Sequence, residues 1–220
     1  MLRAFLAGER AITAILVFLL LMLFVVLPLS RGGMLQVTSR VTLTVLLLFT
    51  LVTVARRHGR LAGIGLLVGA AVGLDWLQFV LPSRATAAIG GALAVGGVLA
   101  LTVLLLVRVL GEGKVTWHRI NGAVAVYLLL AVLFAVAFAV VDASVDHAYT
   151  LAAGERPEGG WGGFLYFSLV TLTTVGYGDI TAVHPMARSL AALEALVGQL
   201  FPAILIARLV SLEIADRRLE

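Results

Sequence analysis

The sequence predicts an all-α integral membrane protein with six transmembrane helices and one short re-entrant helix. Apolar residues make up 61% of the 220 residues and charged residues only 13%, and the mean hydropathy is +1.10. Soluble domains hold about 45–50% apolar residues, so the excess indicates burial in lipid. The apolar residues also occur in runs that approach the roughly 20 helical residues needed to cross a bilayer.

Six apolar runs are long enough to cross the membrane. We expect spans at 11–29, 38–55, 61–81, 85–107, 120–141 and 187–210. The first span follows Arg3 and Arg10, as a signal peptide would. No small-residue cleavage site follows it, so we expect it to remain as a membrane helix. The segment 162–172 is too short to cross and too apolar for a surface loop, which predicts a re-entrant helix.

The lysines and arginines predict how the helices are oriented. Six spans place both termini on one side, and that side carries eleven basic residues against five on the other. Because basic loops favour the cytoplasmic side, we expect both termini in the cytoplasm and the chain in the plasma (inner) membrane. The re-entrant segment then enters from outside. The net charge of +4 is thus attributed to topology and not to nucleic-acid binding.

A glycine-punctuated stretch, TTVGYGD at 173–179, follows the re-entrant segment. Irregular backbone is tolerated at membrane depth only if it is buried in protein or lines a watery cavity. Together with the preceding FSLVTL, this stretch resembles the pore helix and selectivity filter of potassium channels. The resemblance covers roughly 118–212 and divides the chain into an N-terminal four-helix bundle (1–110) and a pore domain (111–220). The first four spans match the six-helix branch of that family only in number and topology.

The resemblance implies a K⁺ filter built from backbone oxygens. Carbonyls of Thr174, Val175, Gly176 and Tyr177, with the Thr174 hydroxyl, would coordinate K⁺ in rings of four. Carbonyls that all face one axis need alternating backbone handedness, and Gly176 and Gly178 adopt the left-handed form without steric cost. One filter segment per chain implies a homotetramer surrounded by membrane lipids. K⁺ is then the permeant ion, and no other cofactor is expected.

Side chains next to the filter are expected to support it. The Tyr177 ring could brace the filter against Phe167, and the Tyr166 hydroxyl could donate a hydrogen bond to Asp179. Alternatively, Tyr166 is an ordinary interfacial aromatic residue, since aromatic side chains favour the membrane surface.

Glu194 is the only carboxylate within the last span. It could face the pore axis, where four carboxylates would attract cations. It could instead accept hydrogen bonds from Ser168, Thr171 or Thr173 beside the filter. We favour the second arrangement because four converging charges oppose one another's ionisation. Glu194 would then either couple the inner helix to the filter during gating or serve as a buried carboxyl group that only stabilises the fold.

The last span also contains the predicted gate. Gly198 follows Gly178 by 20 residues, where the inner helices of the family have a hinge glycine, and Pro202 leaves the Gly198 carbonyl without its helical partner. The pair predicts a bend, and the segment 204–212 then forms the intracellular constriction. The predicted gate residues there are Ile204, Ala207, Val210 and Ser211. Plain helix packing is the alternative role for the glycine and the proline.

The first four spans do not form a conventional voltage sensor. Such a sensor needs arginines at every third position of the fourth helix, and 85–107 contains no charge. Glycines spaced four residues apart in the third span, and further glycines in the fourth, predict close helix packing. Asp75 could pair with Arg84 or Arg40, although a water-exposed interfacial aspartate is the simpler expectation.

Nothing in the sequence indicates an enzyme. The four histidines show no metal-ligand spacing, and the glycine-rich stretch at 159–163 lacks the lysine of a phosphate-binding loop. Cysteine is absent, which excludes disulfides. The sequence therefore predicts a K⁺ channel gated at the inner helix or at the filter. The alternative is a non-conducting membrane sensor or scaffold that binds K⁺ structurally.

Overall fold

The computed structural model describes residues 2–30, 33–55, 62–111, 116–151 and 161–217. Almost all of this part of the chain is helical, which confirms the predicted all-α membrane fold. The elements are α1 (Leu2–Leu21), η1 (Met22–Val26), α2 (Leu27–Leu29), α3 (Gly33–Ala55), α4 (Ala62–Val80), α5 (Arg84–Leu110), α6 (Trp117–Ser144), β1 (Tyr149–Leu151), α7 (Trp161–Leu172), β2 (Ile180–Ala182) and α8 (Pro185–Arg217). A π-helical turn, η1, joins α1 to α2.

Five helical segments of the described chain are long and apolar enough to cross a membrane. They correspond to the predicted first, second, fourth, fifth and sixth spans: Ile12–Leu29, Gly33–Thr50, Arg84–Leu110, Trp117–Ser144 and Pro185–Ser211. The predicted third span forms α4, in which the described residues Gly65–Gln78 make a shorter apolar helix. The predicted re-entrant helix is also present, as the short apolar helix α7.

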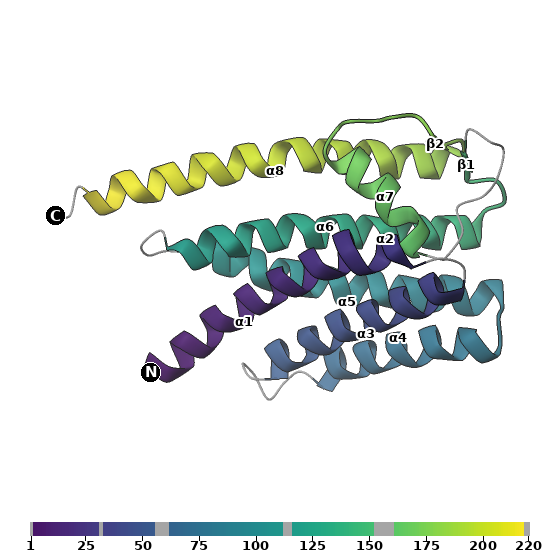
Figure 1. Ribbon diagram of the computed structural model, residues 1–220, viewed down its shortest axis with the longest axis horizontal. Coiled ribbons are helices and arrows are strands. Elements are labelled where there is room, and N and C mark those ends of the chain that lie inside the picture. The colour runs from purple at the N-terminus through teal and green to yellow at the C-terminus, as the bar shows by residue number, and fades with distance from the viewer. Residues whose placement is uncertain (1, 31–32, 56–61, 112–115, 152–160, 218–220) are drawn as a thin grey trace.

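The helices run roughly along one direction, and α7 crosses them near one end (Figure 1). The first residues of α1 and the last residues of α8 lie at the opposite end from α7 and the two strands (Figure 1). Chain ends at the same end of the bundle are what an even number of membrane crossings predicts. The TTVGYGD stretch starts next to Gly198, near the middle of α8, and ends at β2, so it lies in the half of the bundle remote from the chain ends.

Close packing around α5 depends on glycine at two positions. A Cβ at Gly91 would lie 2.5 Å from a methyl group of Val140 on α6, and one at Gly97 would collide with Leu47 on α3. The predicted close packing is thus found along α5. It is not found at Gly69 of α4, where nothing lies within 4 Å of a built Cβ. Glycine spacing alone did not predict which face of α4 meets its neighbours.

The buried core extends from α1 to α8 without a break between the two predicted halves of the chain. Leu19 of α1, Leu101 of α5 and Leu129 of α6 are fully buried members of one apolar cluster. Gly122 of α6 contacts Ile12 of α1 as well as Val109 of α5. The N-terminal helices therefore pack directly on α6 of the same chain.

Two short strands connect the end of α6 with the segment that follows the TTVGYGD stretch. β1 and β2 are antiparallel, with Thr150 opposite Thr181, and the Val183 amide donates to the Ala148 carbonyl at 2.9 Å. The sequence did not predict these strands, since three residues are too few to show an alternating pattern. Their pairing fixes where the chain leaves the stretch and enters α8.

Candidate functional site

The TTVGYGD segment begins where α7 ends, and its first half is bonded to the last turn of that helix. The Val170 carbonyl accepts from the amides of Val175 at 2.9 Å and Gly176 at 3.3 Å. The Thr174 amide donates to the Thr171 carbonyl at 2.9 Å. One helical carbonyl thus anchors two successive residues of the irregular segment, which fixes its starting direction.

Backbone handedness alternates along this segment. The φ angles of Thr174, Gly176 and Gly178 are +59°, +59° and +79°. The glycines were predicted to be left-handed, but Thr174 was not, because a β-branched residue pays about 1–2 kcal/mol for that conformation. The hydrogen bond from the Thr174 amide to the Thr171 carbonyl of α7 helps to hold this conformation. Alternation at every second residue is the geometry that turns successive carbonyls toward one side.

The carbonyl oxygens of the segment are available to a ligand. Within the described residues, those of Thr174, Val175, Gly176 and Tyr177 accept no hydrogen bond. The side chains of Val175 and Tyr177 are exposed in the single chain. Described side chains provide no group of three or more His, Asp or Glu residues that could hold a metal ion. The segment therefore presents a row of backbone oxygens as its chemical feature.

Phe167 does not brace Tyr177 within one chain, contrary to the sequence prediction. Its ring lies in the core, 4.9 Å from the ring of Phe138 and 5.7 Å from that of Tyr149. Burial, with a contribution from nearby Asp142, raises the pKa of Tyr149 and keeps it neutral. Helical periodicity explains the difference, because the core-facing side of α7 carries Phe167 away from the exposed Tyr177.

Tyr166 occupies the other face of α7, beside the end of the irregular segment. The nearby Asp179 carboxylate raises the pKa of the Tyr166 hydroxyl, and Asp179 accepts a hydrogen bond from the Ile180 amide at 3.0 Å. Tyr166 is 45% exposed in the single chain. Tyr166 and Asp179 thus lie near each other, and the hydrogen bond between them stays a prediction.

The C-terminal end of α7 is enclosed by two other helices. The Tyr127 hydroxyl of α6 donates to the Leu172 carbonyl at 3.2 Å. On α8, Gly198 lies so close to the same carbonyl that an added Cβ would collide with it. Carbonyls at a helix C-terminus lack intrahelical partners, and here one is satisfied by a tyrosine. Sequence reasoning missed the Tyr127 contact, for which the sequence offers no local signal.

Glu194 is fully buried and points toward α7. Its Oε1 contacts the Ser168 hydroxyl, and the same hydroxyl lies 2.7 Å from the Ala131 carbonyl of α6. Among the described residues, Oε2 of Glu194 has no partner. Ser168 therefore joins α6, α7 and α8 at one point. Thr173, another partner considered for Glu194, instead donates to the Leu169 carbonyl at 2.7 Å.

The predicted gate residues lie on the second half of α8, which stays helical through Gly198 and Pro202. Four of them are exposed in the single chain: Ile204, Ala207, Val210 and Ser211. Exposed apolar side chains also occur earlier in the helix, at Leu193, Leu196 and Leu200. One face of α8 is therefore uncovered along most of its length.

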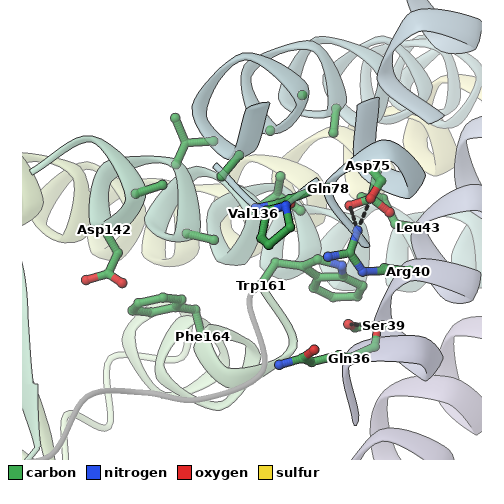
Figure 2. A pocket seen from close by; sticks show the side chains of 18 residues that line it. Gln36, Ser39, Arg40, Leu43, Asp75, Gln78, Val136, Asp142, Trp161 and Phe164 are labelled. Carbon is green, nitrogen blue, oxygen red and sulfur yellow. Dashed lines mark hydrogen bonds and ion pairs between the residues drawn. The ribbon is translucent and has the colours of Figure 1, made fainter. Parts of the chain in front are cut away.

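Asp75 is not the water-exposed aspartate that the sequence favoured. It pairs with Arg40 of α3 at 3.4 Å, and the two side chains are only 17% and 14% exposed. Arg84, the other candidate, pairs with Asp146 instead, at 2.7 Å. The pair lies at the edge of a cavity between the N-terminal helices and α6 and α7 (Figure 2).

Comparison with known proteins identifies one domain. Residues 122–214 match the family model described as "Ion channel". The matched range contains most of α6 and of α8, all of α7 and the TTVGYGD segment. No curated protein and no solved structure matches the chain.

Proposed function

Because residues 122–214 match the family model described as "Ion channel", we propose that this multi-pass membrane protein forms a K⁺-selective pore. Potassium would pass through it down its electrochemical gradient. The observation that carries the proposal is the alternating left-handed backbone at Thr174, Gly176 and Gly178. With unpartnered carbonyls between them, this segment offers the oxygen ligands that replace the hydration shell of K⁺ in potassium-channel filters with the same motif.

Four chains are needed to complete the pore. One chain supplies one segment, whereas a dehydrated K⁺ needs oxygens on all sides, so fourfold symmetry about the conduction axis is the simplest closure. The exposed filter side chains and the uncovered face of α8 support this assembly. Val175 is 53% and Tyr177 70% exposed in the single chain. Neighbouring chains would cover these side chains, and membrane lipids would cover the outer helices.

The filter is proposed to face the outside of the plasma membrane, with both chain ends in the cytoplasm. The excess of basic residues on the side of the chain ends supports this orientation. A cation in the central cavity would then face the C-terminal ends of the four α7 helices. Their helix dipoles place partial negative charge there, which lowers the cost of holding the ion at the membrane centre.

Gating is proposed to act at the inner helix or at the filter. The contacts of α8 with the base of the filter support this, since Gly198 abuts Leu172 and Glu194 contacts Ser168. A displacement of α8 would be passed to α7 through these contacts. The fourth helix carries no charge between 85 and 107, so a conventional voltage sensor is not part of the proposal.

A flux assay tests the proposal. The purified chain is reconstituted into liposomes loaded with K⁺. The liposomes are diluted into K⁺-free buffer without valinomycin, and K⁺ efflux is followed. A passive channel predicts efflux that scales with protein content and is absent from empty liposomes. A folded tetramer that produces no efflux under varied pH, voltage and lipid would favour the alternative function, a non-conducting sensor or scaffold that binds K⁺ structurally.

A further inference from the structure

A cavity of about 500 Å³ lies between the N-terminal helices and the outer and pore helices of the same chain (Figure 2). Its wall is formed by parts of α3, α4, α5, α6 and α7 near the end of the bundle that holds the strands. Pockets for small molecules and cofactors usually measure about 300–1,000 Å³. The cavity is therefore large enough for a ligand, and it is separate from the filter segment.

The cavity wall contains polar groups that have no partner in the described protein. Trp161 is 94% buried, since it is only 6% exposed, and its Nε1–H donates to nothing among the described residues. Oδ2 of Asp75 is likewise buried without a donor there. Burying an unpartnered polar group costs about 1–3 kcal/mol. A ligand that accepts from Trp161 and donates to Asp75 would satisfy both groups.

Charges on the wall restrict the ligand further. Arg40 bonds Asp75 only through Nη1, which leaves its other N–H groups available toward an anionic oxygen. Asp75, beside Arg40, keeps one buried carboxylate oxygen without a donor among the described residues. A zwitterion fits these two neighbours, with its anionic end at Arg40 and Trp161 and its cationic end at Asp75. A purely anionic ligand would offer Asp75 no cation.

Apart from Gln36, Ser39 and Gln78, the remaining wall is apolar and favours a membrane lipid over a soluble zwitterion. Small residues of α5, including Gly90 and Ala94, line the cavity together with Val136 and Ala139 of α6. Ala94 lies ten residues into α5, about 15 Å from its start at 1.5 Å per residue. Polar groups at the end of the bundle and apolar groups further in match the order of a phospholipid head group and its acyl chains.

We propose that this cavity binds one phospholipid with a phosphoethanolamine head group. The phosphate accepts from Trp161 and Arg40, and the primary ammonium donates to Asp75. A choline head group has the same charge but no N–H donor, so it leaves Asp75 unsatisfied. A glycerol head group has donors but carries a net negative charge. Because Trp161 begins α7, the bound lipid would connect α3 and α4 to the pore helix.

Native mass spectrometry of the purified full chain tests the proposal without depending on conduction. The protein is titrated with phosphatidylethanolamine, phosphatidylcholine and phosphatidylglycerol of identical acyl chains. The ethanolamine lipid is expected to bind about tenfold more tightly than the other two, as expected for one charge-assisted hydrogen bond. Equal retention of the three lipids would overturn the proposal, because general annular binding ignores the head group.

Variants place the binding at this cavity. Trp161→Phe removes the unpartnered N–H together with one ring of the side chain and is expected to weaken ethanolamine-lipid binding about tenfold. Trp117→Phe makes the same change at an exposed tryptophan and leaves the binding unchanged. Ala87→Leu fills the cavity from its wall and is expected to abolish the preference for the ethanolamine lipid over the other two lipids. Ala85→Leu, on the exposed side of the same helix, serves as its control. Unchanged binding in both Trp161→Phe and Ala87→Leu would overturn the assignment.

Water-soluble phosphoethanolamine distinguishes the lipid from a soluble ligand with the same head group. It lacks the acyl chains that would contact the apolar wall, so it is expected to displace the lipid only at concentrations at least a hundredfold higher, which corresponds to burying a few methylene groups. Displacement at equal concentration would show that the lipid assignment is wrong.

Discussion

Gly198 of α8 lies directly against the Leu172 carbonyl at the end of α7. A Cβ at position 198 would lie 2.7 Å from the Leu172 carbonyl carbon and 3.0 Å from its Cα. These are backbone atoms, which cannot move aside by a rotamer change. The glycine therefore has a packing role at the base of the filter, in addition to any role in bending α8. From the sequence, packing and bending were alternative predictions for the role of Gly198.

The packing role predicts that Gly198→Ala destabilises the protein. Overpacking against backbone typically costs about 1–3 kcal/mol, so a lower thermal unfolding temperature of the reconstituted protein is expected. Gly69→Ala is the matched control, since nothing lies within 4 Å of a Cβ there, and it should be neutral or slightly stabilising. Equal unfolding temperatures for wild type and Gly198→Ala would contradict this close contact.

Pro202 provides a test of the hinge that is independent of the contact with Leu172. Pro202→Ala restores the amide that can bond the Gly198 carbonyl, so α8 should resist bending at this turn. We expect a lower open probability in single-channel recordings, with the same conductance when open. Ala203→Gly, at an exposed neighbouring position, adds backbone freedom and should act in the opposite direction. An unchanged open probability in Pro202→Ala would remove the hinge from the account.

Most of the fold could be predicted because membrane helices show their length directly in the apolar runs. The left-handed backbone at Gly176 and Gly178 could also be predicted, since glycine favours the φ that these residues adopt. Contacts between helices could not be predicted in this way. The bond from Tyr127 to Leu172 joins residues 45 positions apart, and no periodicity indicates such a pair. The neighbours of Phe167 could not be predicted either, because they depend on how α7 is rotated about its axis.

The contact between Glu194 and Ser168 predicts a neutral carboxyl group. The Ser168 hydroxyl has one hydrogen, and the Ala131 carbonyl 2.7 Å away can only accept it. The contact with Glu194 then needs a hydrogen from the carboxyl group. Glu194→Gln supplies such a donor and should keep the unfolding free energy within about 0.5 kcal/mol. Glu194→Ala removes it and should cost about 1–3 kcal/mol, measured by thermal unfolding.

Two outcomes would contradict this account of Glu194. Equal destabilisation by glutamine and alanine would show that the buried group is an ionised carboxylate. A large loss of conductance in Glu194→Gln with normal assembly would favour a ring of charges on the pore axis. Gln199→Ala, at an exposed position on the same helix, controls for general effects of substituting α8.

The proposed bond between Tyr166 and Asp179 predicts an effect on how fast the channel inactivates during sustained opening. Tyr166→Phe removes the hydroxyl that α7 offers to the Asp179 carboxylate, so the outer end of the filter loses one attachment. We expect current during sustained opening to decline faster than in wild type, with little change in unfolding temperature. Tyr149→Phe is the control, because the Tyr149 hydroxyl has no partner in the described residues. Identical decay in wild type and Tyr166→Phe would make the bond structurally incidental.

The central claim is that the segment 173–179 selects K⁺. Its most direct test is the reversal potential of single channels in a planar bilayer with K⁺ on one side and Na⁺ on the other. Wild type is expected to reverse far from zero, at a potential that opposes the flow of K⁺. Gly178→Ala strains a residue at φ +79° and should lose the preference, whereas Gly73→Ala, with open space around it, should keep it. A wild-type reversal near zero, or a selective Gly178→Ala channel, would contradict the filter assignment.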